Sequence, residues 1–184
     1  MTQNNISNSC FSSKSSLEPK IYVACLASYN SGIFHGEWID ATQGQDVIQD
    51  EINAILKRSS ISGAEEWAIH DFEDFGRNTL SEYESISVVS EMAEFIESHG
   101  ELGIKLMEHF YSIECAEDAI ENYYYGEHES ELDFASDLFD DCYGCDIPDN
   151  VKYYIDYDAF CRDIFMSDYF SIELHGRTHV FSNQ

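Results

Sequence analysis

The residues of this sequence that could do chemistry are mainly carboxylates, and they are concentrated in one stretch. Between Lys105 and Lys152 the chain has 14 Asp and Glu residues and no Lys or Arg over 46 positions. Like charges that crowd one surface repel one another in the compact state, so ordinary soluble domains intersperse both signs. A chain that tolerates this repulsion favours electrostatic binding of a basic partner over bond-making chemistry.

The spacing of these carboxylates is helical. A helix that starts near Ser112 advances about 100° and 1.5 Å per residue, which places four carboxylates on one face over about 10 Å. Their interval of roughly 3.5 Å is close to the phosphate spacing along one DNA strand, about 3.4 Å. Similar rows recur in predicted helices after Ser85 and Ser130. The predicted anionic surface comprises Glu91, Glu94, Glu97, Glu114, Glu117, Asp118, Glu121, Asp137, Asp140 and Asp141.

A single row of this kind is as typical of a solvated helix face as of a docking surface. The recurrence of the rows on several helices, without balancing lysines, favours a docking surface. The formal net charge of −27 excludes direct binding to nucleic acid or to an anionic membrane, because both need cationic footprints. It indicates a basic partner or metal cations, and adaptation to high salt is a third interpretation.

Cysteine and histidine offer a second kind of chemistry. The pairs Cys142-x2-Cys145 and His175-x3-His179 consist of residue types that bind zinc. About thirty residues separate the two pairs, however, which is more than in a usual zinc finger. Acidic neighbours also oppose thiolate formation. We therefore expect ordinary thiols and histidines, with no metal and no cofactor. The sequence has no Gly-rich phosphate loop, GxSxG or HExxH motif, so we do not expect an enzyme.

The compartment and the terminal segment follow from composition. No signal peptide and no apolar membrane span are visible, which predicts a cytoplasmic protein with reduced thiols. Residues 1–19 are rich in Ser and Asn and are predicted to be a flexible tail.

The hydrophobic pattern of the segments that position these side chains predicts an α+β fold with three domains. Residues 20–80 form an antiparallel-sheet module, with strands at 21–27, 34–40 and 66–73, a turn at 29–32 and a helix over 44–58. Residues 81–121 form a helical bundle, in which a break at His99–Gly100 separates two helices. Val88, Val89, Met92, Phe95 and Ile96 are expected to face inward in the first of them.

Residues 122–184 form a second α+β module. A short strand at 123–128 precedes a helix with Ser130 and Asp133 as its capping box. Pro148 starts a further helix that carries Val151, Tyr154 and Ile155, and another helix surrounds Ile164. A hairpin with its turn at Gly176–Arg177 completes the module. The capping-box helix is expected to bury Leu132, Ala135, Leu138 and Phe139.

Several stretches of the chain resemble the ArdA family of antirestriction proteins over about residues 21–174. Singly each stretch is short, but together they are highly specific. The stretches are IYVACLASYNSG, GEWID, EEWAIHDFE, YGEHESELDFA and YIDYDAFCRDIFMSDYF.

The resemblance implies an elongated protein of three small domains in line, joined as a homodimer near YGEHESELDFA. It implies a DNA mimic, typically carried on mobile genetic elements, that occupies the DNA-binding groove of Type I restriction–modification enzymes at their methyltransferase core. An acidic regulator or chaperone of another basic DNA-binding protein is the alternative. The segment that is similar to the family's antirestriction motif comprises Tyr125, Gly126, Glu127, His128, Glu129, Ser130, Glu131, Leu132, Asp133, Phe134 and Ala135.

Overall fold

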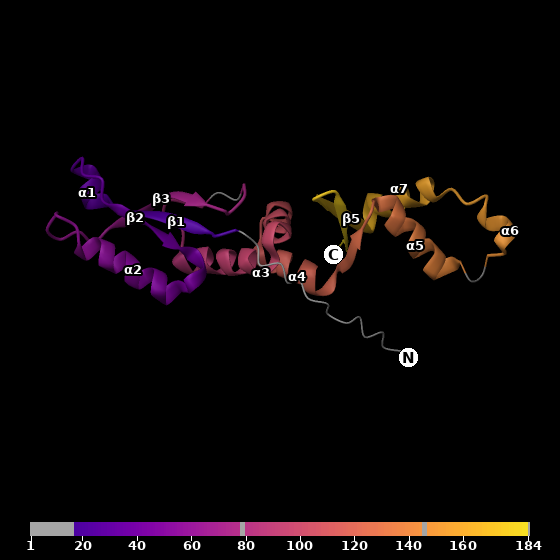
Figure 1. Cartoon of the computed structure of the whole chain (residues 1–184), viewed down its shortest axis with the longest axis horizontal. Helices are drawn as coiled ribbons and strands as arrows, with labels where there is room; N and C mark the ends of the chain where they lie inside the picture. The colour runs from indigo at the N-terminus through magenta and orange to yellow at the C-terminus, as the bar shows by residue number, and fades with distance from the viewer. Residues whose placement is uncertain (1–16, 78–79, 145–146, 184) are drawn as a thin grey trace. The chain divides into compact units, whose positions relative to one another are not determined.

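The computed structural model describes residues 17–77, 80–144 and 147–183 of the chain. The chain divides into two compact units, unit 1 (Met1–Glu108) and unit 2 (His109–Gln184). Each unit combines helices with its own three-stranded antiparallel sheet, which confirms the predicted α+β class (Figure 1). The finer division into three domains, with boundaries after residues 80 and 121, stays a prediction.

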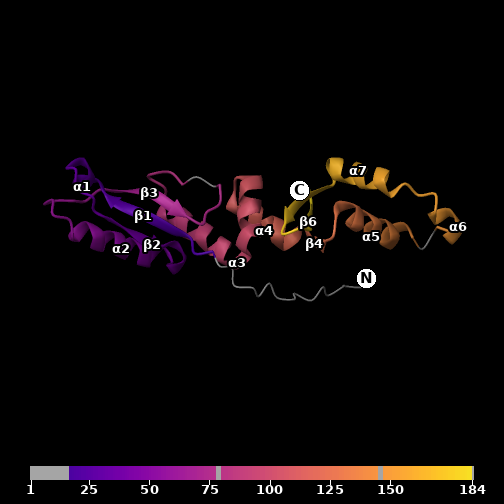
Figure 2. The same ribbon diagram turned by 45° about the horizontal axis from the view of Figure 1, so that its top comes forward.

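The sheet of unit 1 has its first strand in the middle. Strand β1 pairs antiparallel with β2 on one side and with β3 on the other. Helix α2 runs beside this sheet (Figure 2). It buries Ile48, Ile52 and Ile55, which recur at helical spacing. On the strands, Ile21 and Ile39 are buried as well. The elements are β1 (Lys20–Cys25), β2 (Gly36–Asp40), α2 (Gln45–Lys57) and β3 (Trp67–Glu73).

The end of β1 differs from the prediction. The strand stops at Cys25, two residues early, and the one-turn helix α1 (Leu26–Asn30) follows directly. Leucine and alanine favour helix over strand, and the alternating pattern of residues 21–27 concealed this preference. The turn over residues 29–32 lies where it was predicted, since the N–H of Gly32 donates to the carbonyl of Tyr29 at 3.0 Å.

Helix α3 (Ile86–Phe110) contains the predicted break. Gly100 has a φ of 60° and a ψ of −143°, so two helices meet there, as the pair His99–Gly100 predicted. A positive φ favours glycine because it has no Cβ. The predicted inward face is wrong at Val88, which is 36% exposed, whereas Ser90 and Ala93 are buried.

Unit 2 is built around its last strand. Strand β6 lies between β4 and β5, and Val180 and Phe181 on it are fully buried. Helices α5 and α7 pack on this sheet around Phe134 and Ile164. The elements are α4 (Ile113–Asn122), β4 (Tyr124–His128), α5 (Glu131–Tyr143), α6 (Asp149–Lys152), α7 (Tyr157–Ser167), β5 (Tyr169–Leu174) and β6 (Arg177–Ser182).

Three details of unit 2 were predicted wrongly. Phe134, which the prediction left out, is buried in α5 together with the predicted Ala135, whereas Leu132 is 39% exposed, because the helix is turned so that the phenyl ring meets the sheet. The helix after Pro148 has only four residues, and Tyr154 beyond it is 87% exposed. The hairpin turn comes one residue early, at His175 and Gly176, which both have positive φ.

Candidate interface for a basic partner

Helix α4 presents the first predicted row of carboxylates. Its N-terminus is defined by Ser112, whose Oγ accepts the N–H of Cys115 at 3.4 Å. Ala116 and Ala119 are buried on the inner side. Glu114, Glu117 and Glu121 are exposed on the outer side, and Asp118 is half-buried. The small inner side chains let the helix lie close to strands β4 and β6 of the same unit while the row faces solvent.

The rows on α3 and α5 are also exposed. The acidic side chains on α3 are restrained by serines one turn earlier, since Ser87 Oγ donates to Glu91 at 2.8 Å and Ser90 Oγ donates to Glu94 at 3.2 Å. On α5 the Tyr157 hydroxyl donates to Asp140 at 3.0 Å. The exposed members of these two rows are Glu91, Glu94, Glu97, Asp137, Asp140 and Asp141. The row on α3 belongs to unit 1, and the rows on α4 and α5 belong to unit 2.

Several ion pairs of the described ranges use carboxylates outside the three rows. Glu18, Glu37 and Glu108 of unit 1 pair with nearby Lys and Arg side chains at 2.6–3.3 Å. In unit 2 the Arg177 guanidinium pairs with Glu127 at 2.7 Å. Surface pairs of this kind contribute only about 0–1 kcal/mol each.

The segment 125–135 forms the corner between β4 and α5. Gly126 has a φ of 106°, which permits the register shift between β4 and β6 at this position. Ser130 caps α5 by accepting the N–H of Asp133 at 3.1 Å, as predicted. Asp133 Oδ2 accepts the N–H of Glu129 at 3.2 Å, one residue before the position expected for a capping box.

Most acidic side chains of this corner bind to their own unit. Glu127 pairs with Arg177, and Glu131 accepts the Ser171 hydroxyl at 2.6 Å, so both connect the corner to the β5–β6 hairpin. Glu129 is 82% exposed and lies 3.9 Å from Arg177. Phe134 and Ala135 are buried below them. The segment therefore builds the corner as well as contributing charge to it.

A buried polar pair beside the corner was not predicted from the sequence. The Tyr124 hydroxyl lies 2.7 Å from His179 Nδ1, across 55 residues of chain. Burial raises the pKa of Tyr124 to about 12, and the Glu127 charge acts in the same direction. Burial also lowers the pKa of His179, so its ring is neutral near pH 7. Only an alternating pattern that put His179 inside β6 could have indicated this pair.

Two groups of side chains have metal-ligand types. The ligand atoms of His128, Asp133 and Asp137 lie within 4.8 Å of one another and could hold a divalent cation, although Asp133 already accepts the Glu129 N–H. In the sequence-derived zinc set, Cys145 lies outside the described residues. His179 of that set has its Nδ1 at the Tyr124 hydroxyl.

The fold and the rows together define an acidic α+β protein with carboxylates displayed on three helices. Residues 21–177 match the family model described as antirestriction protein (ArdA), which covers most of the chain. The chain belongs to the ArdA family of antirestriction proteins. No individual curated protein matches it.

Membership of the family implies antirestriction activity through interaction with restriction enzymes, and the family is non-catalytic. Among the helices of the described ranges, none is both long enough and apolar enough to cross a membrane.

Proposed function

We propose that this protein inhibits Type I restriction–modification enzymes as a DNA mimic. It occupies the DNA-binding groove at the methyltransferase core, as a stoichiometric inhibitor without turnover. A groove that holds DNA gains affinity when its cationic side chains neutralise phosphates and release the counterions of the DNA, and a rigid row of carboxylates can pair with the same cationic side chains.

The observation that carries this proposal is the exposure of the rows on regular helices. A helix fixes its carboxylates about 1.5 Å apart per residue along the axis, which a disordered acidic tail cannot do. The exposed row on α4 has caps and buried alanines that hold it in place. The charge itself is large, since a net −27 equals the charge on about 46 Å of duplex at one charge per 1.7 Å.

The assembly is part of the proposal. A homodimer joined near the segment 125–135 doubles the charge and the length over which it is displayed. The proposed site of action is the cytoplasm, where restriction enzymes meet incoming DNA. The tyrosines near this segment suit an interface, since Tyr125 is 50% exposed and tyrosine is enriched at interfaces.

A competition experiment tests the mimic directly. The protein is titrated against a labelled duplex bound to a purified Type I methyltransferase, and the displaced duplex is measured by gel shift. We expect stoichiometric displacement, and direct binding of the protein to the methyltransferase, measured without DNA, should weaken at least tenfold between about 50 and 200 mM salt, because the contacts are ionic. A response that is flat with salt contradicts mimicry.

A second basic DNA-binding protein, unrelated to restriction enzymes, serves as the control in the same assay. Selective displacement from the Type I enzyme supports the proposal. Equal displacement from both proteins would instead identify a general acidic regulator or chaperone of basic DNA-binding proteins.

A further inference from the structure

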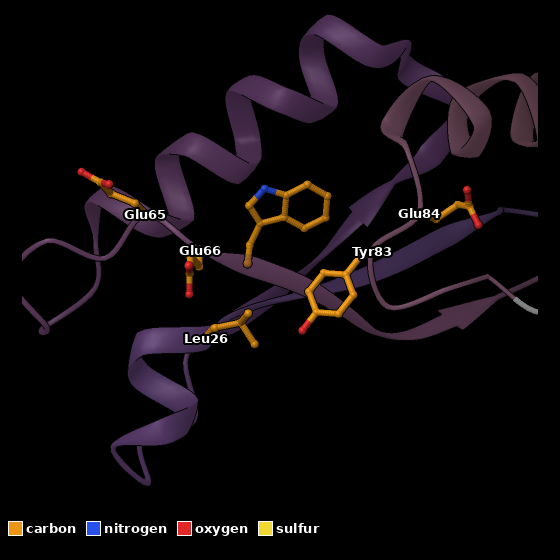
Figure 3. A pocket seen from close by; sticks show the side chains of 6 residues that line it. Leu26, Glu65, Glu66, Tyr83 and Glu84 are labelled. Carbon is orange, nitrogen blue, oxygen red and sulfur yellow. The ribbon is translucent and has the colours of Figure 1, made fainter.

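Unit 1 has an aromatic hollow with acidic residues around it, separate from the three rows. Its volume is about 440 Å³, within the range of ordinary ligand pockets. Figure 3 shows Leu26, Glu66 and Tyr83 around it, with Glu65 and Glu84 on opposite sides in this view. The lining residues are Leu26, Glu65, Glu66, Trp67, Tyr83 and Glu84.

Backbone hydrogen bonds fix the three segments that form the hollow. The N–H of Leu26, at the start of α1, donates to the carbonyl of Glu66 at 3.0 Å. The N–H of Ile69 in β3 donates to the carbonyl of Glu82 at 2.9 Å, which holds the segment that carries Tyr83. The backbone positions of the segments that carry the rings and carboxylates are therefore set before any ligand binds.

Large aromatic side chains that stay accessible need a reason. Tyr83 is 70% exposed, and Trp67 is half-buried although it begins a strand. A ring face attracts a cation placed over it, most strongly for tryptophan. The three glutamates add charge that favours a cation and repels phosphates and carboxylates. The hollow thus selects a positively charged group with a flat or apolar surface.

We propose that this hollow binds an arginine side chain of the protein partner. A guanidinium is planar, stacks on aromatic rings, is weakly hydrated and donates paired hydrogen bonds to carboxylates, whereas a lysine ammonium is a compact, strongly hydrated charge. The proposal rests on the proposed function, since the partner is the restriction enzyme. The hollow would add one specific contact to an interface whose other contacts are between charged groups.

Removal of a ring from the hollow should weaken binding without changing its salt dependence, whereas removal of a charge should change both. In direct binding to the methyltransferase, Trp67→Ala and Tyr83→Ala should each raise the apparent Kd three- to tenfold and leave its salt dependence unchanged, because ring contacts release no counterions. Glu66→Gln and Glu84→Gln should weaken binding and also lower the salt slope, by up to about 0.9 for each charge.

Matched variants make the result interpretable. Trp38→Ala removes the other tryptophan of unit 1, which is 43% exposed and lies outside the hollow, and should bind like wild type. Tyr83→Ala still tests the hollow if Trp67→Ala misfolds, since a side chain that is 70% exposed contributes little to the core. A Kd within twofold of wild type for Tyr83→Ala and for a folded Trp67→Ala overturns the proposal.

A direct probe separates failure of the hollow from failure of the mimic. In a Trp38→Phe variant, Trp67 is the remaining tryptophan and reports on the hollow by its fluorescence. N-acetyl-arginine amide should change its emission saturably, and N-acetyl-alanine amide should not. An equal or stronger response to N-acetyl-lysine amide, or none to arginine, overturns the assignment. If wild-type protein displaces no duplex but arginine binds, the hollow stands and the DNA-mimic proposal fails.

Discussion

The two units have the same kind of sheet and different interiors. The sheet of unit 1 is filled by aliphatic side chains such as Ile21, Ile39 and Ile52, all at most 1% exposed. Unit 1 also buries Phe75 and Phe95, but unit 2 has a larger cluster of ring contacts, with the buried Phe134 packed against the half-buried Phe165 and Tyr169. Unit 1 has 18 Asp and Glu against 6 Lys and Arg, for a net −12, and unit 2 has 18 against 3, for a net −15.

The comparison shows how a small unit can carry excess charge. Unit 2 is the shorter unit and has fewer cations to offset repulsion. Aromatic side chains bury more area per residue than aliphatic ones, and ring pairs add about 0.5–1.5 kcal/mol beyond burial. The ring of Phe134 contacts Tyr125, His128, Phe165 and Tyr169 at centroid distances of 5.0–6.0 Å. We infer that these ring contacts offset the repulsion between the acidic rows.

The largest effect is expected from Phe134→Ala. Loss of a buried phenyl ring costs about 3–5 kcal/mol, and unit 2 should unfold at lower denaturant concentration. Both tryptophans, Trp38 and Trp67, lie in unit 1, so their fluorescence reports on that unit alone. The unfolding transition of unit 1, followed by tryptophan fluorescence, should not move, while far-UV circular dichroism should show an earlier loss of structure in unit 2.

Two controls accompany this variant. Ile52→Ala should shift the tryptophan transition by about 2–5 kcal/mol, because it empties the core of unit 1. Met166→Ala, at a side chain 79% exposed, should change neither transition. A single shared transition that moves in the Phe134 variant would contradict the independence of the two interiors.

Neutralising whole rows should have the next largest effect, on binding. The variant Glu114→Gln, Glu117→Gln, Asp118→Asn, Glu121→Gln removes four charges of unit 2 and should lower the salt slope of direct binding to the methyltransferase by up to about 3.6. The variant Glu91→Gln, Glu94→Gln, Glu97→Gln should lower it by up to about 2.7. Any single substitution should change affinity by less than threefold, because the charge is distributed. One Asp→Asn change that abolished inhibition would indicate a localised site instead.

A smaller loss of stability is expected at the corner of unit 2. Ser130→Ala removes the oxygen that accepts the Asp133 N–H and should cost about 1 kcal/mol in denaturant unfolding. Ser112→Ala on α4 should cost no more, because its hydrogen bond is longer, at 3.4 Å. Ser130→Asn retains a capping oxygen and should restore most of the loss. An unchanged midpoint for Ser130→Ala would contradict a stabilising role for this cap.

The smallest effect is a pH dependence confined to unit 2. Since burial lowers the pKa of His179, the unfolded chain takes up a proton at higher pH than the folded chain. Stability should therefore fall as the pH drops below about 6.5, the usual histidine value. Glu127 opposes this shift, whereas Arg177 and His175 reinforce it.

His179→Gln should flatten that dependence, because glutamine is uncharged and can still accept the Tyr124 hydroxyl. His175→Asn, in the exposed turn where asparagine tolerates a positive φ, should leave the dependence in place. Thermal unfolding from pH 7.5 to 5.5 measures both variants. Equal slopes for wild type and His179→Gln would contradict a titrating His179.

Local features account for the parts of the fold that the sequence predicted well. The serines at 112 and 130 start their helices, Gly100 interrupts α3, and the alternating residues of β5 and β6 pair as a hairpin. Each of these rests on backbone preferences and on neighbours within a few residues. The exposure of the acidic rows followed from the same spacing, since carboxylates rarely enter a core without partners.

The sequence by itself thus determined the family, the α+β class and the helices that carry the charge. Tertiary structure alone decided that Phe134 rather than Leu132 faces the sheet, and that His179 meets Tyr124. It also brought Leu26, Trp67 and Tyr83 around one hollow. These outcomes depend on side chains far apart in the chain, whose meeting is set by strand register and helix rotation. A one-residue slip of a strand would send its side chains to the opposite face, and a one-residue shift along a helix would turn them by about 100°.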